Sequence, residues 1–418
     1  MFWIGEATVY TLLFISLYFE VFLLVTFLEK RAGRSALSAV KGVSNLPRVC
    51  IVVPCFNEEL TLASTMESVR ALRYPRELLD TIIVDDGSTD RTLQIAEECV
   101  RACPVVGAER HTIRVFHKEN GGKHTALNLA LQNTEAEIIG CLDADSTVAE
   151  DALMRVIHAF VNPDISAVTP GVHVRKPKTA LQHIQNVEYT LSVFNRFMFA
   201  ALGSVFITPG AFSMYRTKAV RDLGGWRHGH STEDMELALR MQENGHKIAN
   251  APAAAVYTAT PKTLKGLFRQ RVRWTYGFLR NFADYKFMFG NRAYGNLGLF
   301  ILPAALISIG TGIYFFARVL WYGLESLYGM FERMQVTGVV PHPSFDLFYF
   351  NTSALLMISV VTILLVLILI SAGSWIGTGR RMPPAGTPLF ILLYGLIVPL
   401  WISTAVFRAV FKTGVRWR

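Results

Sequence analysis

The sequence predicts an α/β domain that is built on a mostly parallel sheet and lies between transmembrane helices. Two observations support this fold class. Strand-like apolar runs alternate with helix-like segments between residues 48 and 145, which is the pattern of βαβ units. Long apolar runs suited to a bilayer occur near the N-terminus and after residue 295, in a chain of 418 residues of which 51% are hydrophobic.

The first apolar run, Ala7–Leu28, is about long enough to cross a bilayer. Neither a preceding basic residue nor a following small-residue cleavage site is present, so a cleaved signal peptide is not expected. The run is followed by four basic residues, Lys30, Arg31, Arg34 and Lys41. Because a basic flank stays on the cytoplasmic side, we expect a transmembrane helix at residues 1–29 and a cytosolic domain at residues 45–290 of a cell-membrane protein.

About three further transmembrane or re-entrant helices are expected within residues 295–411. Their apolar runs are Leu297–Leu320, Phe350–Ile370 and Pro388–Phe407. Arg380 and Arg381 favour a cytoplasmic loop before the last run, and strict alternation would then place the basic C-terminal tail (Lys412, Arg416, Arg418) outside. Either the last segment is re-entrant or the charge rule fails here, and Pro399 permits a bend in it.

Four strands are expected in the middle domain, and each runs into a polar loop. They lie within residues 48–59, 81–84, 112–117 and 136–145, with helices at 60–72, from about 91, and at 124–134. The loops read FNEE, DDGSTD, ENGGK and DAD. In a parallel sheet these loops meet at the carboxyl ends of the strands, where ligands bind.

The loop DDGSTD places two acids side by side at a strand end. A turn and a helix cap explain its Gly, Ser and Thr, but not both Asp85 and Asp86. Carboxylate acceptors at this point suit the ring N–H of a base and the hydroxyls of a ribose.

The loop ENGGK places two glycines before Lys123 at a helix start, which lets the backbone approach a phosphate. A P-loop is excluded, because His117 and His124 stand where it needs Gly and Ser or Thr. A plain helix cap is the alternative to a phosphate contact by Lys123.

Asp143 and Asp145 follow the fourth apolar run. On an extended strand, residues two apart point to the same side, and two carboxylates aimed together repel each other unless a cation lies between them. Hard oxygen ligands suit Mg²⁺ or Mn²⁺ shared with substrate phosphates. D-x-D alone is frequent by chance, so the metal hypothesis depends on its position beside the other polar loops.

STEDMELALRM predicts a capped helix with three acids near its start, Glu233, Asp234 and Glu236. Stabilisation of the helix dipole explains one acid. One of the others is a candidate general base that takes a proton from an acceptor hydroxyl.

QRVRWTYG combines guanidinium groups with an indole. Arg271 and Arg273 suit a diphosphate, and Trp274 offers a flat face to a sugar ring. An amphipathic segment at the membrane surface is the alternative. Earlier in the chain, Tyr189–Arg216 is apolar and predicts a helix lying on the membrane, after which residues 208–210 return towards the pocket.

The ordered set VVPCFNEE, DDGSTD, NGGKHTALN, DAD, TED and QRVRW resembles the membrane-embedded family 2 glycosyltransferases. These include cellulose, chitin-oligosaccharide, hyaluronan and poly-β-1,6-N-acetylglucosamine synthases. The likeness spans residues 48–277 and implies a GT-A-type nucleotide-sugar-binding domain with flanking transmembrane helices. It implies inverting, processive transfer from a UDP-sugar, with UDP-N-acetylglucosamine or UDP-glucose as the expected donor.

The resemblance also implies roles for individual residues. Asp86 and the loop with Pro54, Asn57 and Glu58 would hold the uridine, and Lys123 and Asp143 would contact the nucleotide. Asp145 would bind the Mg²⁺ or Mn²⁺ that bridges the diphosphate, and Asp234, next to Glu233, would be the base. Gln270 and Arg273 would bind the nucleotide, Trp274 would lie under the acceptor sugar, and Thr208 and Gly210 would line the acceptor entrance.

The implied partners are the UDP-sugar, a polysaccharide acceptor and the lipid bilayer, with an accessory subunit as a further candidate; nothing resembles a nucleic-acid module. Cellulose synthases of the large type need more spans than this chain has, and the layout is closer to the poly-N-acetylglucosamine and chitin-oligosaccharide synthases. Two other hypotheses stay open. One is transfer of a single sugar to a lipid-linked acceptor, and the other is a transporter or receptor, against which the acidic pairs argue.

Overall fold

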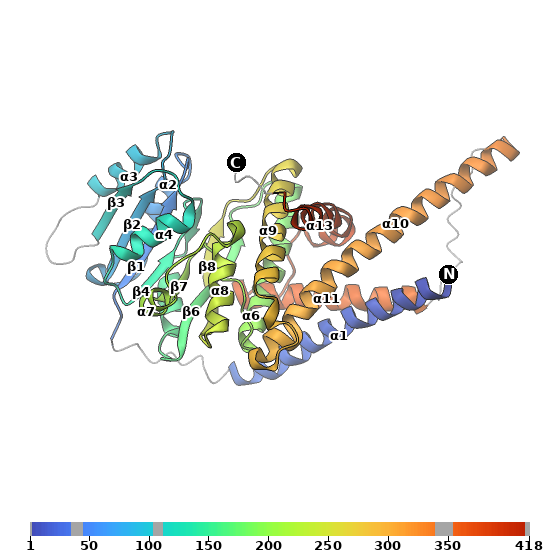
Figure 1. The fold of residues 1–418 in the computed structure, drawn as a ribbon, viewed down its shortest axis with the longest axis horizontal. Helices are drawn as coiled ribbons and strands as arrows, with labels where there is room; N and C mark the ends of the chain where they lie inside the picture. Colours follow the sequence, from blue (N-terminus) through green and yellow to red (C-terminus); the bar gives the residue numbers. More distant parts are fainter. Residues whose placement is uncertain (1, 35–44, 103–111, 339–353, 414–418) are drawn as a thin grey trace.

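A central eight-stranded sheet organises the computed structural model, which describes residues 2–34, 45–102, 112–338 and 354–413 (Figure 1). The strand order is β3-β2-β1-β4-β7-β6-β8-β5. The strands are β1 (Val49–Cys55), β2 (Leu79–Asp85), β3 (Thr112–His117), β4 (Ile138–Cys141), β5 (Ser146–Val148), β6 (Ile165–Val174), β7 (Ser213–Arg216) and β8 (Lys247–Thr258). Lys41, Arg416 and Arg418 lie outside the described residues.

The predicted parallel half of the sheet is confirmed. β1 pairs in parallel with β2 and β4, and β2 pairs in parallel with β3. Successive residues of β1 pack against different clusters, since Val49 and Ile51 face one side of the sheet and Cys50 and Val52 face the other. Both faces are covered by helices, which is why this strand is a continuous apolar run instead of an alternating one.

Helices cover the sheet on both faces. One face is packed by α2 (Leu62–Arg70), α3 (Thr92–Arg101) and α5 (Ala152–Ala159). The other face is packed by α4 (Lys123–Gln132), α7 (Thr217–Asp222) and α8 (Glu233–Glu243). This layering places the polar loops after β1, β2, β3 and β4 together at one edge of the sheet.

The segment 189–216 differs from its prediction as a single membrane-surface helix. Helix α6 (Ala180–Ala201) begins earlier and ends at Ala201, and Ser213–Arg216 forms β7 inside the sheet. β7 runs antiparallel to both β4 and β6. The polypeptide between α6 and β7 therefore crosses the edge of the sheet at which the polar loops meet.

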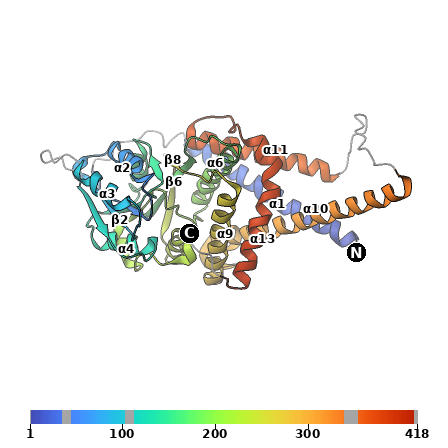
Figure 2. The ribbon, with the colours of Figure 1, turned by 90° about the horizontal axis from the view of Figure 1, so that it is seen from above.

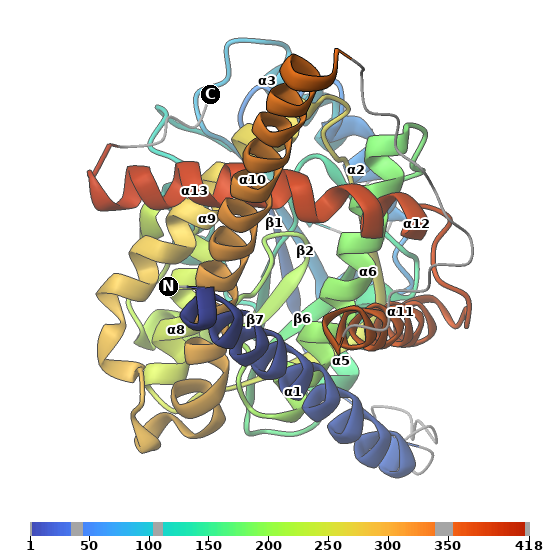
Figure 3. The same ribbon diagram turned by 90° about the vertical axis from the view of Figure 1, so that its right-hand side faces the viewer.

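Among the residues that the structure describes, four helical segments are long and apolar enough to cross a membrane: Ala7–Lys30, Leu297–Thr337, Ala354–Thr378 and Thr387–Val410. They belong to α1 (Phe2–Arg34), to α10 (Leu302–Thr337) with the π-turn before it, to α11 (Ala354–Thr378), and to α12 (Thr387–Leu389), the π-turn η6 (Phe390–Tyr394) and α13 (Gly395–Val410). α1, α10 and α11 extend away from the sheet on the same side, whereas α13 runs crosswise to α1 and α11 (Figures 2 and 3).

Two helices lie between the sheet and these apolar helices (Figure 1). α6 packs Val193, Phe194 and Met198 against α1 and α11. α9 (Leu264–Asp284) packs Leu267 and Val272 against Trp401 and Ala405 of α13. Each helix therefore has one side towards the domain and another towards the apolar bundle.

Candidate active site

One cavity of about 1460 Å³ opens at the carboxyl ends of β1, β2 and β4. It continues between α6 and α9 to side chains of α10 and α13. Twelve of the fourteen predicted site residues line it: Pro54, Glu58, Asp86, Lys123, Asp143, Asp145, Gly210, Glu233, Asp234, Gln270, Arg273 and Trp274. The sequence motifs thus converge on one space, although they are spread over more than two hundred residues.

Asn57 is not among the lining residues. Its amide oxygen accepts a hydrogen bond from the backbone N–H of Thr89 at 2.9 Å, and its own N–H donates to Ser88 Oγ at 2.9 Å. Asn57 also has a left-handed backbone, with φ of 56°, which Asn tolerates better than most residues. Asn57 thus joins the loop after β1 to the loop after β2, and its expected uridine contact stays a prediction.

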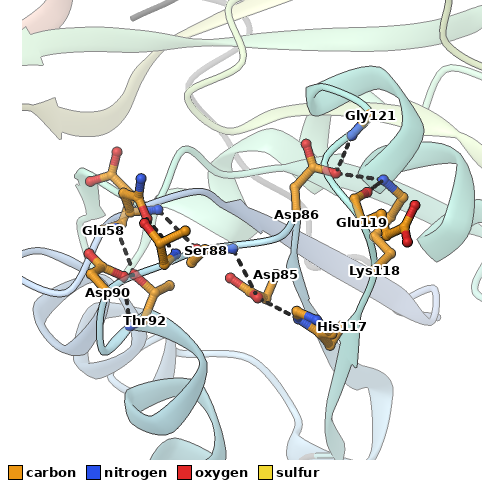
Figure 4. A network of polar contacts seen from close by, with 12 residues as sticks. Glu58, Asp85, Asp86, Ser88, Asp90, Thr92, His117, Lys118, Glu119 and Gly121 are labelled. Carbon is orange, nitrogen blue, oxygen red and sulfur yellow. Dashed lines mark hydrogen bonds and ion pairs between the residues drawn. The ribbon is translucent and has the colours of Figure 1, made fainter.

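Asp86 faces the loop that precedes α4 (Figure 4). Its carboxylate accepts hydrogen bonds from Gly121 N at 3.1 Å and Gly122 N at 2.8 Å, and lies 2.6 Å from Lys118 Nζ. The neighbouring Asp85 is fully buried and pairs with His117 Nδ1 at 2.7 Å. Asp85 and Asp86 thus fix the chain after β2 to the end of β3 and the loop that follows it, and Asp86 also lines the cavity.

Lys123 lies at the centre of the cavity's charges. Its ammonium is 2.6 Å from Asp143 Oδ1 and 3.1 Å from Glu233 Oε1. Burial alone would lower the pKa of Lys123, but the nearby carboxylates outweigh burial and hold that pKa well above its usual value. Lys123 therefore stays protonated and joins the loop after β4 to the start of α8.

Gly210 allows the segment before β7 to approach this ion pair. A Cβ added at Gly210 would lie 2.2 Å from Lys123 Nζ and 3.0 Å from Asp143 Oδ1. Any larger residue would displace the lysine, so glycine at this position serves the site and not merely the turn.

Asp143 and Asp145 were expected on an extended strand, but they do not lie on one. β4 ends at Cys141, and the two aspartates lie in a turn closed by a hydrogen bond from Ser146 N to the carbonyl of Asp143 at 2.9 Å. Asp143 pairs with Lys123, whereas the carboxylate of Asp145 accepts a hydrogen bond from Ser146 Oγ at 3.1 Å. The turn explains how both side chains line one cavity with different neighbours.

Asp145 has the environment of a cation ligand. Burial, together with the negative charges of Asp143 and Glu58, raises its pKa to about 6. No group of three or more His, Cys, Asp and Glu side chains in the described residues is arranged to hold a metal ion. One carboxylate with substrate phosphates and waters is, however, a common way of binding Mg²⁺, so the residues present fit a divalent ion that is shared with a ligand.

Asp234 lies in the first turn of α8, next to Glu233. Burial and the charge of Glu233 raise the pKa of Asp234 to about 6. Thr208, predicted at the acceptor entrance, is fully buried and donates from its hydroxyl to the carbonyl of Asp234 at 2.7 Å. Thr208 therefore supports the Asp234 backbone, and its expected acceptor contact stays a prediction.

The third acid of this motif, Glu236, points away from the cavity. It accepts hydrogen bonds from Arg240 at 3.0 and 2.7 Å and from the Tyr285 hydroxyl at 2.9 Å. Arg240 also donates to the backbone carbonyls of Leu223 and Gly225. This buried network fixes α8 to the glycine-rich loop before it, so Glu236 is structural and not a candidate base.

A strained turn precedes Asp234. Gly229, His230 and Ser231 all have left-handed backbones, with φ of 52°, 52° and 68°. α9 holds this turn, because Arg273 donates to the Ser231 carbonyl at 3.2 Å and Asp284 lies 2.7 Å from His230 Nε2. Strain of this kind persists only where the surroundings fix it, and it gathers at functional sites.

The distance between α9 and α8 is set by a small residue. A Cβ added at Gly277 would lie 2.4 Å from Thr232 Oγ1. Asn281, one turn later, donates to the same oxygen at 2.8 Å. The helix that carries Gln270, Arg273 and Trp274 therefore packs directly on the residues before Asp234.

Sequence reasoning missed the cavity wall that α6 provides. Glu188, Ser192 and Arg196 lie one turn apart on this helix and all line the cavity, together with Tyr189. Tyr394, Trp401 and Ile402 extend the wall from the last apolar segment. Glu188, Ser192 and Arg196 recur at every fourth position, which places them on one face of a helix, and this spacing was the available signal for the α6 wall.

Comparisons with known proteins agree with this geometry. A family model described as "Glycosyltransferase like family 2" matches residues 47–277. The poly-beta-1,6-N-acetyl-D-glucosamine synthase of Staphylococcus aureus (strain COL) is 32% identical over 239 residues, which is 56% of each chain. The Staphylococcus epidermidis protein of the same name is 30% identical over 270 residues, 63% of each chain. The chain thus spans a little over half the length of these relatives.

Among solved structures, the mannosyltransferase PcManGT from Pyrobaculum calidifontis, in complex with GDP-Man and Mn²⁺, has a TM-score of 0.55 to this chain. The two are 17% identical, and the superposition covers 96% of this chain and 99% of that one. The likeness extends over the apolar helices as well as the sheet, and at this identity it establishes the fold alone.

Proposed function

Because the chain belongs to glycosyltransferase-like family 2, we propose that it transfers sugars from a UDP-sugar to a growing polysaccharide. The observation that carries the proposal is the set of side chains that line the cavity described above. Asp145, Lys123 and Asp234 line it beside Trp274, and its wall continues to α10 and α13. The proposed donor, base and acceptor positions would therefore share one space that extends to the apolar helices.

The donor would bind at the edge of the sheet, with its uridine near Asp86 and Glu58. Lys123, which keeps its proton, and Arg273 would contact the diphosphate. A divalent ion held by Asp145 would neutralise charge on the departing diphosphate. The negative charges of Asp143 and Glu58 lie close to Asp145 and repel its charge. A bound divalent ion would relieve this repulsion, which favours its binding.

Asp234 would accept the proton of the acceptor hydroxyl while the hydroxyl oxygen bonds to the anomeric carbon. The bond from that carbon to the diphosphate breaks on the opposite face, so the configuration inverts. The raised pKa of Asp234 suits this task, because a stronger base takes a hydroxyl proton more readily and is still ionised at neutral pH. Trp274 would support the acceptor sugar, and processive transfer follows if the product stays there between additions.

The assay that tests the function uses the full-length protein with each radiolabelled UDP-sugar in turn and with Mn²⁺ or Mg²⁺. We expect transfer from UDP-N-acetylglucosamine or UDP-glucose and products many sugars long, whose linkage is identified with linkage-specific glycanases. Products of a single sugar would reject processivity in favour of transfer to a lipid-linked acceptor. No transfer from any nucleotide sugar would overturn the proposal.

We also propose a membrane topology in which α1, α10 and α11 cross the bilayer and α13 lies along the cytosolic surface. Its support is the crosswise course of α13 (Figure 3) and its packing on α9. Arg380, Arg381 and Lys412 would then all lie on the side of the domain, as basic residues prefer. A protease-sensitive tag fused after residue 418 is expected to be protected in intact cells, and cleavage from outside would contradict this topology.

A further inference from the structure

Trp274 is held from one side by a second residue of its own helix. The guanidinium carbon of Arg271 lies 4.2 Å from the centre of the indole. Residues three apart on a helix are neighbours on one face, which lets the two side chains stack. Trp274 is 36% exposed and lines the cavity, so the indole has one side covered by Arg271 while part of it stays open.

Arg271 is itself fixed from the neighbouring helix. It is 4% exposed, and its Nη2 lies 2.7 Å from Glu188 Oε2 of α6. Its Nη1 donates to Gln270 Oε1 at 3.2 Å, and the Tyr189 ring lies 5.9 Å from its guanidinium carbon. A buried guanidinium held by a carboxylate has little freedom to turn, and so it presents a fixed surface to the indole.

The contacts of Arg271 also keep it protonated. Burial alone would lower the pKa of Arg271, but Glu188 beside it outweighs burial and holds that pKa above its usual range. The last apolar segment closes the arrangement. Tyr394 of η6 lines the same cavity, and its ring centre lies 5.7 Å from that of Trp401 of α13, which packs on Leu267 and Val272 of α9.

We propose that Glu188 and Arg271 form a brace that fixes Trp274 with one face covered and the other presented to the acceptor sugar, so that the brace sets how long the product stays bound. The inference rests on the proposed polysaccharide synthesis and adds Glu188, on α6, and Arg271 as positioning residues. An indole held in one orientation loses less freedom when a sugar stacks on it, so the complex with the acceptor dissociates more slowly.

The brace also gives a reason for an ion pair to be buried at this position. A buried ion pair is weak evidence for stability, because desolvation offsets the attraction between its charges. Glu188 and Arg271 are not needed as a charge source for the donor, which has Lys123 and Arg273 nearby in the same cavity. Glu188 holds Arg271, and Arg271 stacks on the indole of Trp274. The pair therefore acts on the position of this indole.

The test is a comparison of product length and of kinetic constants in brace variants. Arg271→Lys keeps the positive charge beside Glu188 but removes the planar stacking surface. Glu188→Gln combined with Arg271→Gln removes both charges, so that neither is left buried alone. We expect shorter products and a KM for a soluble oligosaccharide acceptor that rises about 5- to 30-fold, the equivalent of a desolvated cation–π contact. The KM for the UDP-sugar is expected to change far less.

The control is Asp164→Asn, which removes an equally short but exposed ion pair with Lys247 at the far end of β8. It is expected to leave product length unchanged. A further variant, Trp274→Leu, separates positioning from general support of the fold. If the brace acts through the indole, adding Arg271→Lys to Trp274→Leu shortens the products no further.

Unchanged product length in the brace variants would overturn the inference, and so would an equal rise in both KM values or full additivity with Trp274→Leu. These outcomes all require a wild-type protein that makes polymer. A wild-type protein that transfers no sugar at all would instead reject the proposed function, so the two failures are distinguishable.

Discussion

The Asp234→Asn variant is expected to lose sugar transfer by about 10²- to 10⁴-fold, because the amide cannot accept the acceptor proton. Asn has almost the same shape as Asp and keeps an oxygen for the hydrogen bond from Met235 N, which is 2.8 Å from Asp234 Oδ1. UDP-sugar binding should persist, so the loss falls on kcat more than on the donor KM. The matched control is Asp222→Asn, which changes an exposed helical aspartate paired with Lys218.

The pH dependence of activity and of stability provides a second test of the role of Asp234. The base must be ionised, so wild-type activity should fall as pH drops through about 6, the raised pKa of Asp234. The effect on stability has the opposite sign. The folded state holds this proton more tightly than the unfolded chain, whose Asp titrates near about 4, so stability is lost as pH rises from about 4 to about 6. Asp234→Asn should flatten part of this decline. Retained activity in the variant would remove Asp234 from the base role.

Asp145→Asn is expected to lower metal-dependent transfer at least about a hundredfold, since it removes the proposed ligand of the divalent ion. The apoprotein should become more stable at neutral pH, because the ionised Asp145 lies beside Asp143 and Glu58 with a pKa raised to about 6. Adding UDP with Mn²⁺ should raise the melting temperature of the wild type and have a much smaller effect on the variant.

The control for this experiment is Asp151→Asn, in which an exposed aspartate paired with Arg155 is changed. It should respond to UDP and Mn²⁺ as the wild type does. If Asp145→Asn destabilised the apoprotein and kept the full thermal response to the metal, Asp145 would not be the ligand. Titration calorimetry of Mn²⁺ in the presence of UDP gives a direct measure of the same difference.

The parallel half of the fold was predictable because its physical signals are local. β1 is a continuous apolar run, and the polar loops that follow the strands stand out against it. β6 and β8 were missed because their sequences, ISAVTPGVHV and KIANAPAAAVYT, contain proline and many small residues. Their pairing has register shifts, one of them between Pro170 and Gly171, and only the neighbouring strands make such segments extended.

The same limit applies to the candidate site. Motif residues such as Lys123 and Asp234 were identified because polar groups are conspicuous at strand ends and helix starts. A motif does not reveal which way a side chain turns, so the backbone hydrogen bonds of Thr208 and Asn57 could not be predicted from it. Glu188 was missed because its partner Arg271 is distant in sequence, and no local pattern predicts that pairing.

The composition of the cavity wall has a consequence for the order in which the site is completed during translation. Pro54 and Ile402 line the same space, so its first wall is translated long before its last. A nascent chain still on the ribosome has the sheet and its acidic loops long before α13 emerges to complete the enclosure. A domain cut out before α10 would therefore lack the far wall of the cavity, which α10, α13 and the turn before α13 supply.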